Sequence, residues 1–351
     1  MTLAQRLWRF YQNDIARREK QGNLANPFFS GGSLILIVTT RCNFSCRHCL
    51  RVLEDPKDLP LPVAVKALEG GRKYNYRTVS LTGGEPFVYP HLQELAERAV
   101  ALGYRLVIVT NGYNLLNHAD WLRRFKKGIA LLVFSLESAV AEEHDGLRRQ
   151  GSFERLMKDF AFCRGEKIRF RTATTVSTRN IDALFDIGIL ARKNRAQDLV
   201  FTTMLPCPRT QENQLVLNAQ QRQRLPFELL TLGRLLKKTV FISSDIRGNA
   251  NLKICFPMEM REVAVDAEGR LVQCCELGNF DHPEIQRRAV VADLNTESFD
   301  AAMEKFSLRI HRLIAGRIAD QQTSEARNED PDFNSCFYCI NKILKSPDAP
   351  A

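Results

Sequence analysis

The chain alternates short, β-rich apolar runs with segments that have helical residue spacing, and this alternation constrains the fold more than any other feature. Six candidate strands cover residues 34–39, 78–81, 105–110, 130–135, 168–176 and 199–205. Five candidate helices lie between them, at 62–73, 90–102, 117–125, 152–164 and 181–194, and Asn180 is the expected N-cap of the last. The alternation predicts an α/β fold with a parallel sheet and external helices, and six strands are too few for a closed eightfold barrel.

Beyond residue 205 the alternation ends. A Gln/Arg/Leu-rich helical stretch at 218–238, interrupted by Pro226, is followed by two short strands on either side of a turn at 266–269. We therefore expect five segments. They are a helical lead at 1–33, a main core at 34–210, a helical linker at 211–250, a small cysteine-rich domain at 251–345 and a tail at 346–351.

Charge and hydropathy set limits on the partners of the chain. The longest apolar run, 129–134, is far shorter than the ~18 to 20 residues that span a bilayer, and the N-terminus lacks the pattern of a signal peptide. We therefore expect a cytoplasmic protein without a membrane partner. The net charge is 50 − 40 = +10, but the basic residues are scattered and do not alternate with aromatic ones, so nucleic acid is not an expected partner.

The chain has ten cysteines, which in a reducing cytoplasm are expected to be metal ligands or catalytic groups rather than disulfides. Eight of them fall into two groups, one near the N-terminus and one in the last hundred residues. The sequence therefore predicts two metal sites. Cys163 and Cys207 stand outside both groups and are interpreted as ordinary core or surface thiols.

The first group is the octapeptide CNFSCRHC, which contains Cys42, Cys46 and Cys49 and directly follows the first candidate strand. Spacings of three and two residues let three thiolates converge on one soft metal centre at the end of a strand, where α/β folds keep their active sites. Two interpretations are open at this point. One is a zinc site with His48 as fourth ligand, and the other is a [4Fe-4S] cluster with one open iron.

A second motif follows the second candidate strand: Gly83, Gly84, Glu85 and Pro86. Together, in this order and position, the C-x3-C-x2-C and GGEP motifs resemble those of the radical S-adenosylmethionine (radical SAM) enzymes. The resemblance implies a partial (β/α)6 radical SAM barrel over about residues 34–205. It also implies that Cys42, Cys46 and Cys49 hold a [4Fe-4S] cluster that binds S-adenosylmethionine (SAM), and that the GGEP residues hold its methionine part.

The resemblance extends to softer matches, which would add SAM contacts. In this family, the residue before the third cysteine helps to position adenine, and here it is His48. Asn111 ends the third strand, and Ser135 and Glu137 stand at the end of the fourth, where the family often has Asp in place of Glu137. Arg148 is expected to pair with the methionine carboxylate. No catalytic acid or base can be chosen from the sequence.

The second group contains Cys255, Cys274, Cys275, Cys336 and Cys339. Its predicted hairpin before Cys274 and its C-x2-C pair resemble the Twitch form of the SPASM domain, which implies one auxiliary [4Fe-4S] cluster. The implied ligands are Cys255, Cys274, Cys336 and Cys339, with Cys275 as a neighbour that competes with Cys274. A structural zinc site is the alternative.

The resemblance implies an enzyme that cleaves SAM to a 5′-deoxyadenosyl radical, abstracts a substrate hydrogen and oxidises the substrate radical through the auxiliary cluster. The implied partners are SAM, an electron donor such as flavodoxin or ferredoxin, and a peptide or small-molecule substrate. The short segment before the first strand weakens the peptide interpretation, because many peptide maturases carry a recognition domain there. The alternatives are a radical SAM enzyme of small-molecule or cofactor synthesis with a non-oxidative outcome and, more remotely, a structural zinc protein that binds nucleic acid.

Overall fold

The computed structural model describes residues 9, 13, 32–52, 54–237, 240–242, 255–322 and 335–345. The expected lead at 1–33 lies almost wholly outside the described residues, as do the end of the expected linker and the whole tail at 346–351. No helix within the described ranges is long and apolar enough to cross a membrane.

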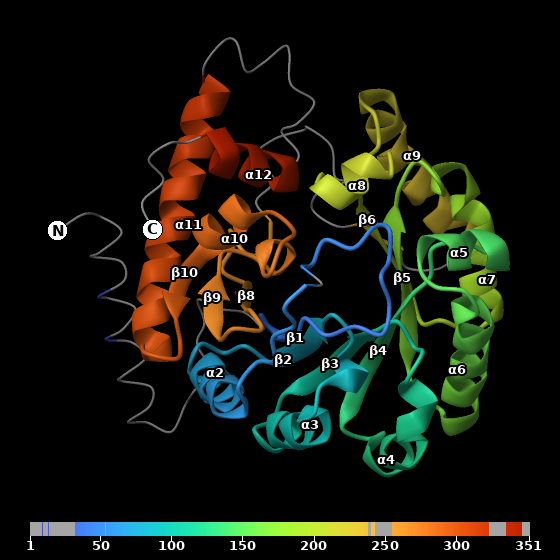
Figure 1. The fold of residues 1–351 in the computed structure, drawn as a ribbon, viewed down its shortest axis with the longest axis horizontal. Coiled ribbons are helices and arrows are strands. Elements are labelled where there is room, and N and C mark those ends of the chain that lie inside the picture. Colours follow the sequence, from blue (N-terminus) through green and yellow to red (C-terminus); the bar gives the residue numbers. More distant parts are fainter. Residues whose placement is uncertain are drawn as a thin grey trace.

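One sheet runs through the molecule in the order β10-β9-β8-β1-β2-β3-β4-β5-β6-β7 (Figure 1). Its strands are β1 Ser33–Thr39, β2 Thr78–Gly83, β3 Arg105–Thr110, β4 Ile129–Ser135, β5 Phe170–Val176, β6 Leu199–Thr203, β7 Val240–Ile242, β8 Glu262–Val265, β9 Arg270–Val272 and β10 Val290–Asp293. Strands β1 to β7 pair in parallel, each with the next along the chain. This confirms the predicted α/β fold with a parallel sheet.

The hairpin of the predicted cysteine-rich domain extends this sheet. Strand β8 pairs in parallel with β1, and β9 and β10 then add in antiparallel fashion. The two strands around the turn at 266–269, β8 and β9, are thus confirmed. They continue the sheet on the side of β1 that faces away from β2. The seventh parallel strand, β7, was not predicted, because a run of three residues is too short to give a strand pattern.

The helices are α2 Leu61–Lys73, α3 Leu92–Ala101, α4 Ala119–Phe125, α5 Ala141–Leu147, α6 Ser152–Glu166, α7 Leu184–Lys193, α8 Pro208–Glu212, α9 Ala219–Leu236, α10 Pro283–Ala289, α11 Phe299–Gln322 and α12 Ser335–Lys345. Helices α2 to α7 and α9 lie around the parallel strands (Figure 1). Helices α10 and α11 contact β10, and α12 packs on α10. Short 3-10 turns are η1 Pro86–Val88, η2 Leu115–His118, η3 Ile181–Ala183 and η4 Cys275–Leu277. All five predicted helices are present, and their ends differ from the prediction by a few residues.

Asn180 stands at the N-cap position of η3, as predicted, but its side chain makes no capping hydrogen bond. Its amide instead bonds to the backbone of Ser177, Thr175 and Glu137 and joins two strand ends. One local prediction was wrong. Pro226 does not interrupt its helix. Buried leucines recur at helical spacing along α9 and pack it against the protein, which outweighs the one backbone hydrogen bond that proline removes.

A second apolar cluster positions the two cysteine groups. Leu205 and Cys207, just beyond β6, pack with Leu277 and with side chains of α10 and α12. Leu50, from the loop of the first cysteine group, and Cys274 and Cys336, from the second group, contact the same cluster. The chain therefore brings together two regions that lie more than two hundred residues apart in the sequence.

Candidate functional site

Cys42, Cys46 and Cys49 lie on the loop that follows β1, as predicted. Cys46 is buried, and the other two are half-buried. Backbone N–H groups turn toward the sulfurs: Phe44 N donates to Cys42 Sγ and Arg51 N donates to Cys49 Sγ, each at 3.4 Å. The loop is thus shaped around its thiols, with N–H donors already directed at them.

Burial dominates the acidity of Cys42 and Cys46. It raises the pKa of Cys42 to about 12, and it raises the pKa of Cys46 to about 11 although the Arg148 charge opposes it. Both thiols are therefore protonated at neutral pH without a metal, and a bound metal would displace the protons because thiolate is the ligand form. Three thiols, two of which accept a backbone N–H donor, fit a sulfur-ligated cluster with one open position.

The GGEP turn packs directly on the cysteine loop. Gly84 N donates to Thr39 O at 2.7 Å and Glu85 N donates to Arg41 O at 2.8 Å. A Cβ on Gly83 would lie 2.2 Å from Thr39 O, and one on Gly84 would lie 2.1 Å from Arg41 O. Both glycines are therefore required by the close approach of two backbone segments, a role that the sequence did not reveal.

Glu85 is fully buried and joins the ends of β2 and β3. Its carboxylate accepts hydrogen bonds from Phe87 N at 3.0 Å, Thr110 Oγ1 at 2.7 Å and Asn111 N at 2.7 Å. Burial raises the pKa of Glu85, and these three bonds oppose the rise. Because the carboxylate already accepts three hydrogen bonds from the protein, its role toward a ligand is to hold the GGEP turn in place. Pro86 starts η1 immediately after it.

Asn111 connects this turn to the cysteine loop. Its Nδ2 donates to Asn43 Oδ1 at 2.8 Å, and Cys42 Sγ lies 3.8 Å away from the same nitrogen. Gly112, the next residue, has a φ of +84°, and a Cβ there would lie 2.4 Å from Asp159 Oδ2. The predicted site residue Asn111 is therefore held at the cysteine loop by a turn that only glycine can complete.

Beyond the end of β4, the fold brings together three predicted residues that are distant in sequence. Arg148 Nη1 donates to Glu137 Oε1 at 2.8 Å, and His48 Nε2 lies 3.5 Å from the same oxygen. Thr175 N donates to Glu137 Oε2 at 3.0 Å. Glu137 is thus occupied by protein donors. Ser135, at the end of β4, takes no part in these bonds and is half-buried.

Sequence reasoning missed this ion pair and its support by His144. Glu137 N donates to His144 Nδ1 at 3.2 Å, and His144 lies one helical turn before Arg148, a spacing that puts both side chains on one face. Burial, together with the Arg148 charge, lowers the pKa of His48 to about 3 and that of His144 to about 4, so both imidazoles are neutral. Arg148 Nε is buried without a hydrogen-bond partner, which leaves it one unused donor.

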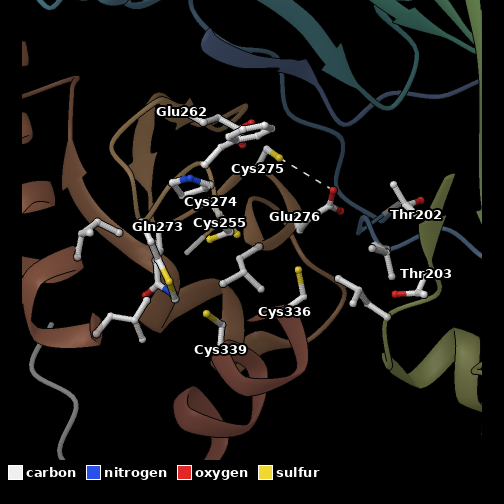
Figure 2. Close-up of a pocket in the computed structure, with 18 of the residues that line it drawn as sticks. Thr202, Thr203, Cys255, Glu262, Gln273, Cys274, Cys275, Glu276, Cys336 and Cys339 are labelled. Atoms are coloured by element: carbon white, nitrogen blue, oxygen red, sulfur yellow. Dashed lines mark hydrogen bonds between the residues drawn. The ribbon is translucent and has the colours of Figure 1, made fainter. Parts of the chain in front are cut away.

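The second cysteine group lines a cavity of about 210 Å³ (Figure 2). Cys255 precedes β8, Cys274 follows β9, and Cys336 and Cys339 lie one turn apart on α12. The figure shows Cys336 and Cys339 reaching from the helix toward Cys255 and Cys274. All five cysteines of this group line the cavity, and so do His48 and Leu50 from the first cysteine loop.

Cys274 and Cys275 face different neighbours. Burial raises the pKa of Cys274 well above its usual value, with further contributions from Cys339, Glu276 and Cys255. The pKa of Cys275 is also raised well above its usual value, first by burial and then by the charges of Glu262 and Glu276. Cys275 Sγ lies 4.0 Å from Glu276 Oε1 (Figure 2). The surroundings favour Cys274 as the fourth member of the cysteine set.

Each cysteine set offers sulfur donors. All ten cysteines lie in the described ranges, and none forms a disulfide. Across those ranges, no three histidine, cysteine or acidic side chains are grouped closely enough to hold a single metal ion. Sulfur donor sets of three and four cysteines are those that iron–sulfur clusters use, and a four-cysteine set also suits zinc.

Comparison with known proteins agrees with this geometry. Residues 36–187 match the sequence profile of the Radical SAM superfamily. A curated relative, the AdoMet-dependent heme synthase of Oleidesulfovibrio alaskensis, is 29% identical over 154 residues, which is 43% of this chain and 39% of the relative. The chain spans less than half the length of that relative.

Two solved structures share the fold. Streptococcus suis SuiB bound to its precursor peptide SuiA superimposes with a TM-score of 0.63 at 13% identity, covering 83% of this chain and 67% of SuiB. The protein anSMEcpe, with bound AdoMet and a peptide, gives a TM-score of 0.62 at 14% identity and covers 80% of this chain and 83% of that one. Residues 36–187, which carry the C-x3-C-x2-C loop and the GGEP turn packed together at the ends of β1 and β2, thus match the Radical SAM superfamily in sequence and in the placement of both motifs.

Proposed function

We propose that the protein reductively cleaves SAM, abstracts a hydrogen from a substrate and oxidises the substrate radical through an auxiliary [4Fe-4S] cluster. The observation that carries the proposal is a shared cavity. His48 and Leu50 from the loop of the first three cysteines line the same cavity as Cys255, Cys274, Cys336 and Cys339. A substrate in this space would have one cysteine set on each side.

The match to the Radical SAM superfamily implies a [4Fe-4S] cluster and SAM. Cys42, Cys46 and Cys49 would hold the first cluster, and the four cysteines around the cavity would hold the second. When bound, the first cluster and SAM supply a 5′-deoxyadenosyl radical, and the second cluster supplies an acceptor for one electron. The protein itself would bind and orient SAM and the substrate, and would keep water out of the cavity.

The residues around the first loop divide that task. Gly83 and Gly84 let the GGEP turn approach the cysteine loop, and Glu85 fixes its position against Asn111. The Arg148 charge acts on Cys46 and Cys42, and its Nη1 is held by Glu137. Its Nε has no partner and would donate to the SAM carboxylate or a sulfur. His48 stays neutral and offers a flat ring for the adenine.

The cavity wall protects a radical. Leu205, Leu277, Met258, Ile310 and Leu313 contribute apolar side chains to it. Such a lining excludes water and stray reductants. Because four cysteines would complete the coordination of the auxiliary cluster, no iron would remain for a substrate group. Electron transfer is then the role that fits this set.

The substrate is proposed to be a peptide, since both compared structures with bound peptides cover most of this chain. A small-molecule substrate is the second candidate, because the curated relative is named as a heme synthase. The electron donor is proposed to be a flavodoxin or a ferredoxin. Mass spectrometry of cell extract before and after anaerobic incubation distinguishes consumption of a peptide from consumption of a metabolite.

The first experiment measures 5′-deoxyadenosine after anaerobic incubation with SAM and dithionite. The wild type should be brown, contain about eight irons per chain and form 5′-deoxyadenosine. Replacing Cys42, Cys46 and Cys49 together by Ala should abolish this product and leave about half the iron. Cys163→Ala, in the core, is the control and should retain both. A colourless protein that contains only zinc would refute the proposal.

The second experiment tests the acceptor role. A Cys336→Ala, Cys339→Ala variant should still cleave SAM, because the first loop is untouched, but should make no oxidised product. Normal product at the normal rate would show that the second set only braces the structure. Circular dichroism and the iron content of the first cluster establish that the variant is folded.

A further inference from the structure

One part of the cavity lining is acidic. Glu262 on β8 and Glu276 in η4 line the cavity next to Cys275 (Figure 2). Thr175 and Thr202 line it as well. The described lining residues include no lysine or arginine. His48 is the single imidazole among them, and its Nε2 faces Glu137 Oε1 at 3.5 Å.

Three guanidinium groups close to lining residues of this cavity are bound to other parts of the chain. Arg51 Nη1 donates to the backbone carbonyls of Glu276 and Gly278, and Arg148 donates to Glu137. Arg317 lies over the Tyr338 ring and reaches Met258 Sδ at 3.9 Å. These cations support the walls, and none of them belongs to the described lining.

A charge balance of this kind selects among substrates. Four thiolates around an iron–sulfur cluster would add further negative charge to the same cavity. A phosphate or carboxylate that entered would lose its hydration without gaining a counter-ion among the described lining residues, whereas an amide or ammonium would find carboxyl, thiol and hydroxyl acceptors. Burial raises the pKa of Glu262 to about 7, so its carboxylate is populated from neutral pH upward. Since carboxylates accept hydrogen bonds and repel anions, this wall discriminates by charge as well as by shape.

We propose that the wall formed by Glu262, Cys275 and Glu276 is a substrate subsite that admits a neutral or positively charged group bearing N–H donors and rejects phosphate- and carboxylate-bearing groups. This inference rests on the proposed function, because it specifies the substrate class of the same cavity. Cys275 acts there as a wall residue. From the sequence, Cys275 had no role beyond being a neighbour of Cys274, and the cavity places it in the substrate wall.

Cys275 also provides a reporter for the test. Two thiol reagents of similar size and opposite charge are used: aminoethyl methanethiosulfonate, a cation, and sulfonatoethyl methanethiosulfonate, an anion. Each forms a mixed disulfide with a thiol and releases methanesulfinate. Initial rates are measured anaerobically on protein that contains both clusters, with the modified residue located by tandem mass spectrometry and cluster integrity followed by absorption. Each rate is divided by that for free cysteine.

The cation should modify Cys275 at least about tenfold faster than the anion after this normalisation. Glu262→Gln and Glu276→Gln should each reduce the ratio, and the double variant should reduce it further than either single variant, to the value that the cluster charge alone maintains. Glu284→Gln, on α10 outside the cavity, is the control and should leave the ratio unchanged. Cys275→Ser should remove the labelled site. Because either glutamine variant alone is informative, one that fails to fold does not end the test.

Three results would overturn the inference: equal normalised rates for the two reagents, no modification of Cys275 by either, or modification of Cys274 in its place. Formation of 5′-deoxyadenosine is measured on the same preparations. Loss of the charge ratio with normal SAM cleavage defeats this inference alone. Absence of SAM cleavage with the ratio intact defeats the proposed function and leaves the charge preference of the cavity standing.

Discussion

The Arg148 guanidinium donates to the Glu137 carboxylate at 2.8 Å, and both side chains are buried, at 9% and 2% exposure. The positive charge of this pair lies near Cys46, where it favours the thiolate. Removing the charge of one partner from a buried ion pair is strongly destabilising, because the remaining charge is left without a partner or water.

Glu137→Gln should therefore lower the free energy of unfolding by about 3 kcal/mol. The control is an exposed pair with the same separation, Arg98 and Glu94, at 2.8 Å with both side chains about half exposed. Glu94→Gln should cost less than about 1 kcal/mol. Urea denaturation of the anaerobic protein measures both changes, and equal losses would contradict the role given to burial.

Gly84→Ala should damage the first metal site without touching a cysteine. Its Cβ would meet Arg41 O at 2.1 Å, so the cysteine loop or the GGEP turn must move. We expect the iron of the first cluster and the SAM affinity to fall. Gly165→Ala, in α6 with open space around the added Cβ, is the control and should raise stability by about 0.5 to 1 kcal/mol. Iron analysis and SAM titration measure both variants. Wild-type iron content and SAM affinity in Gly84→Ala would contradict the role given to the close backbone contact.

Cys274→Ser and Cys275→Ser should differ in iron content. Cys274 shares its surroundings with Cys339 and Cys255, whereas Cys275 faces Glu262 and Glu276. The first variant should fall from about eight irons to about four, and the second should keep about eight. The reverse pattern would make Cys275 the ligand and Cys274 its neighbour.

Asp159 should make the stability of the protein pH-dependent. It is fully buried, its two oxygens have no hydrogen-bond partner, and Arg155 Nε is 3.9 Å from Oδ1. Burial, only partly opposed by the Arg155 charge, raises its pKa from 3.8 to about 8. Because the folded form binds this proton more tightly than the unfolded form, the contribution is complete below about pH 4 and is lost as the pH rises to about 8.

Asp159→Asn should remove this dependence and make the variant more stable than the wild type at pH 8. Melting temperatures across that range, compared as differences between the two proteins, provide the measurement. Asp120→Asn, whose side chain is 84% exposed, should leave the slope as it is. A slope that survives in Asp159→Asn would assign the pH dependence to other groups.

The sequence by itself determined the strands, the helices and the two cysteine groups. These depend on apolar periodicity and on spacings within a few residues, which are written locally in the chain. The order of the six predicted strands followed as well, because consecutive strands joined by helices pair in parallel with their neighbours.

The tertiary structure decided what depends on contacts between distant segments. Only folding placed β8 beside β1, set Gly84 against Arg41, and joined Glu137 to Arg148 and His48. It also directed the side chain of the N-cap residue Asn180 to two strand ends, and it carried α9 through Pro226. These features depend on burial and on pairing between segments that are distant in the sequence. A local sequence pattern cannot predict them.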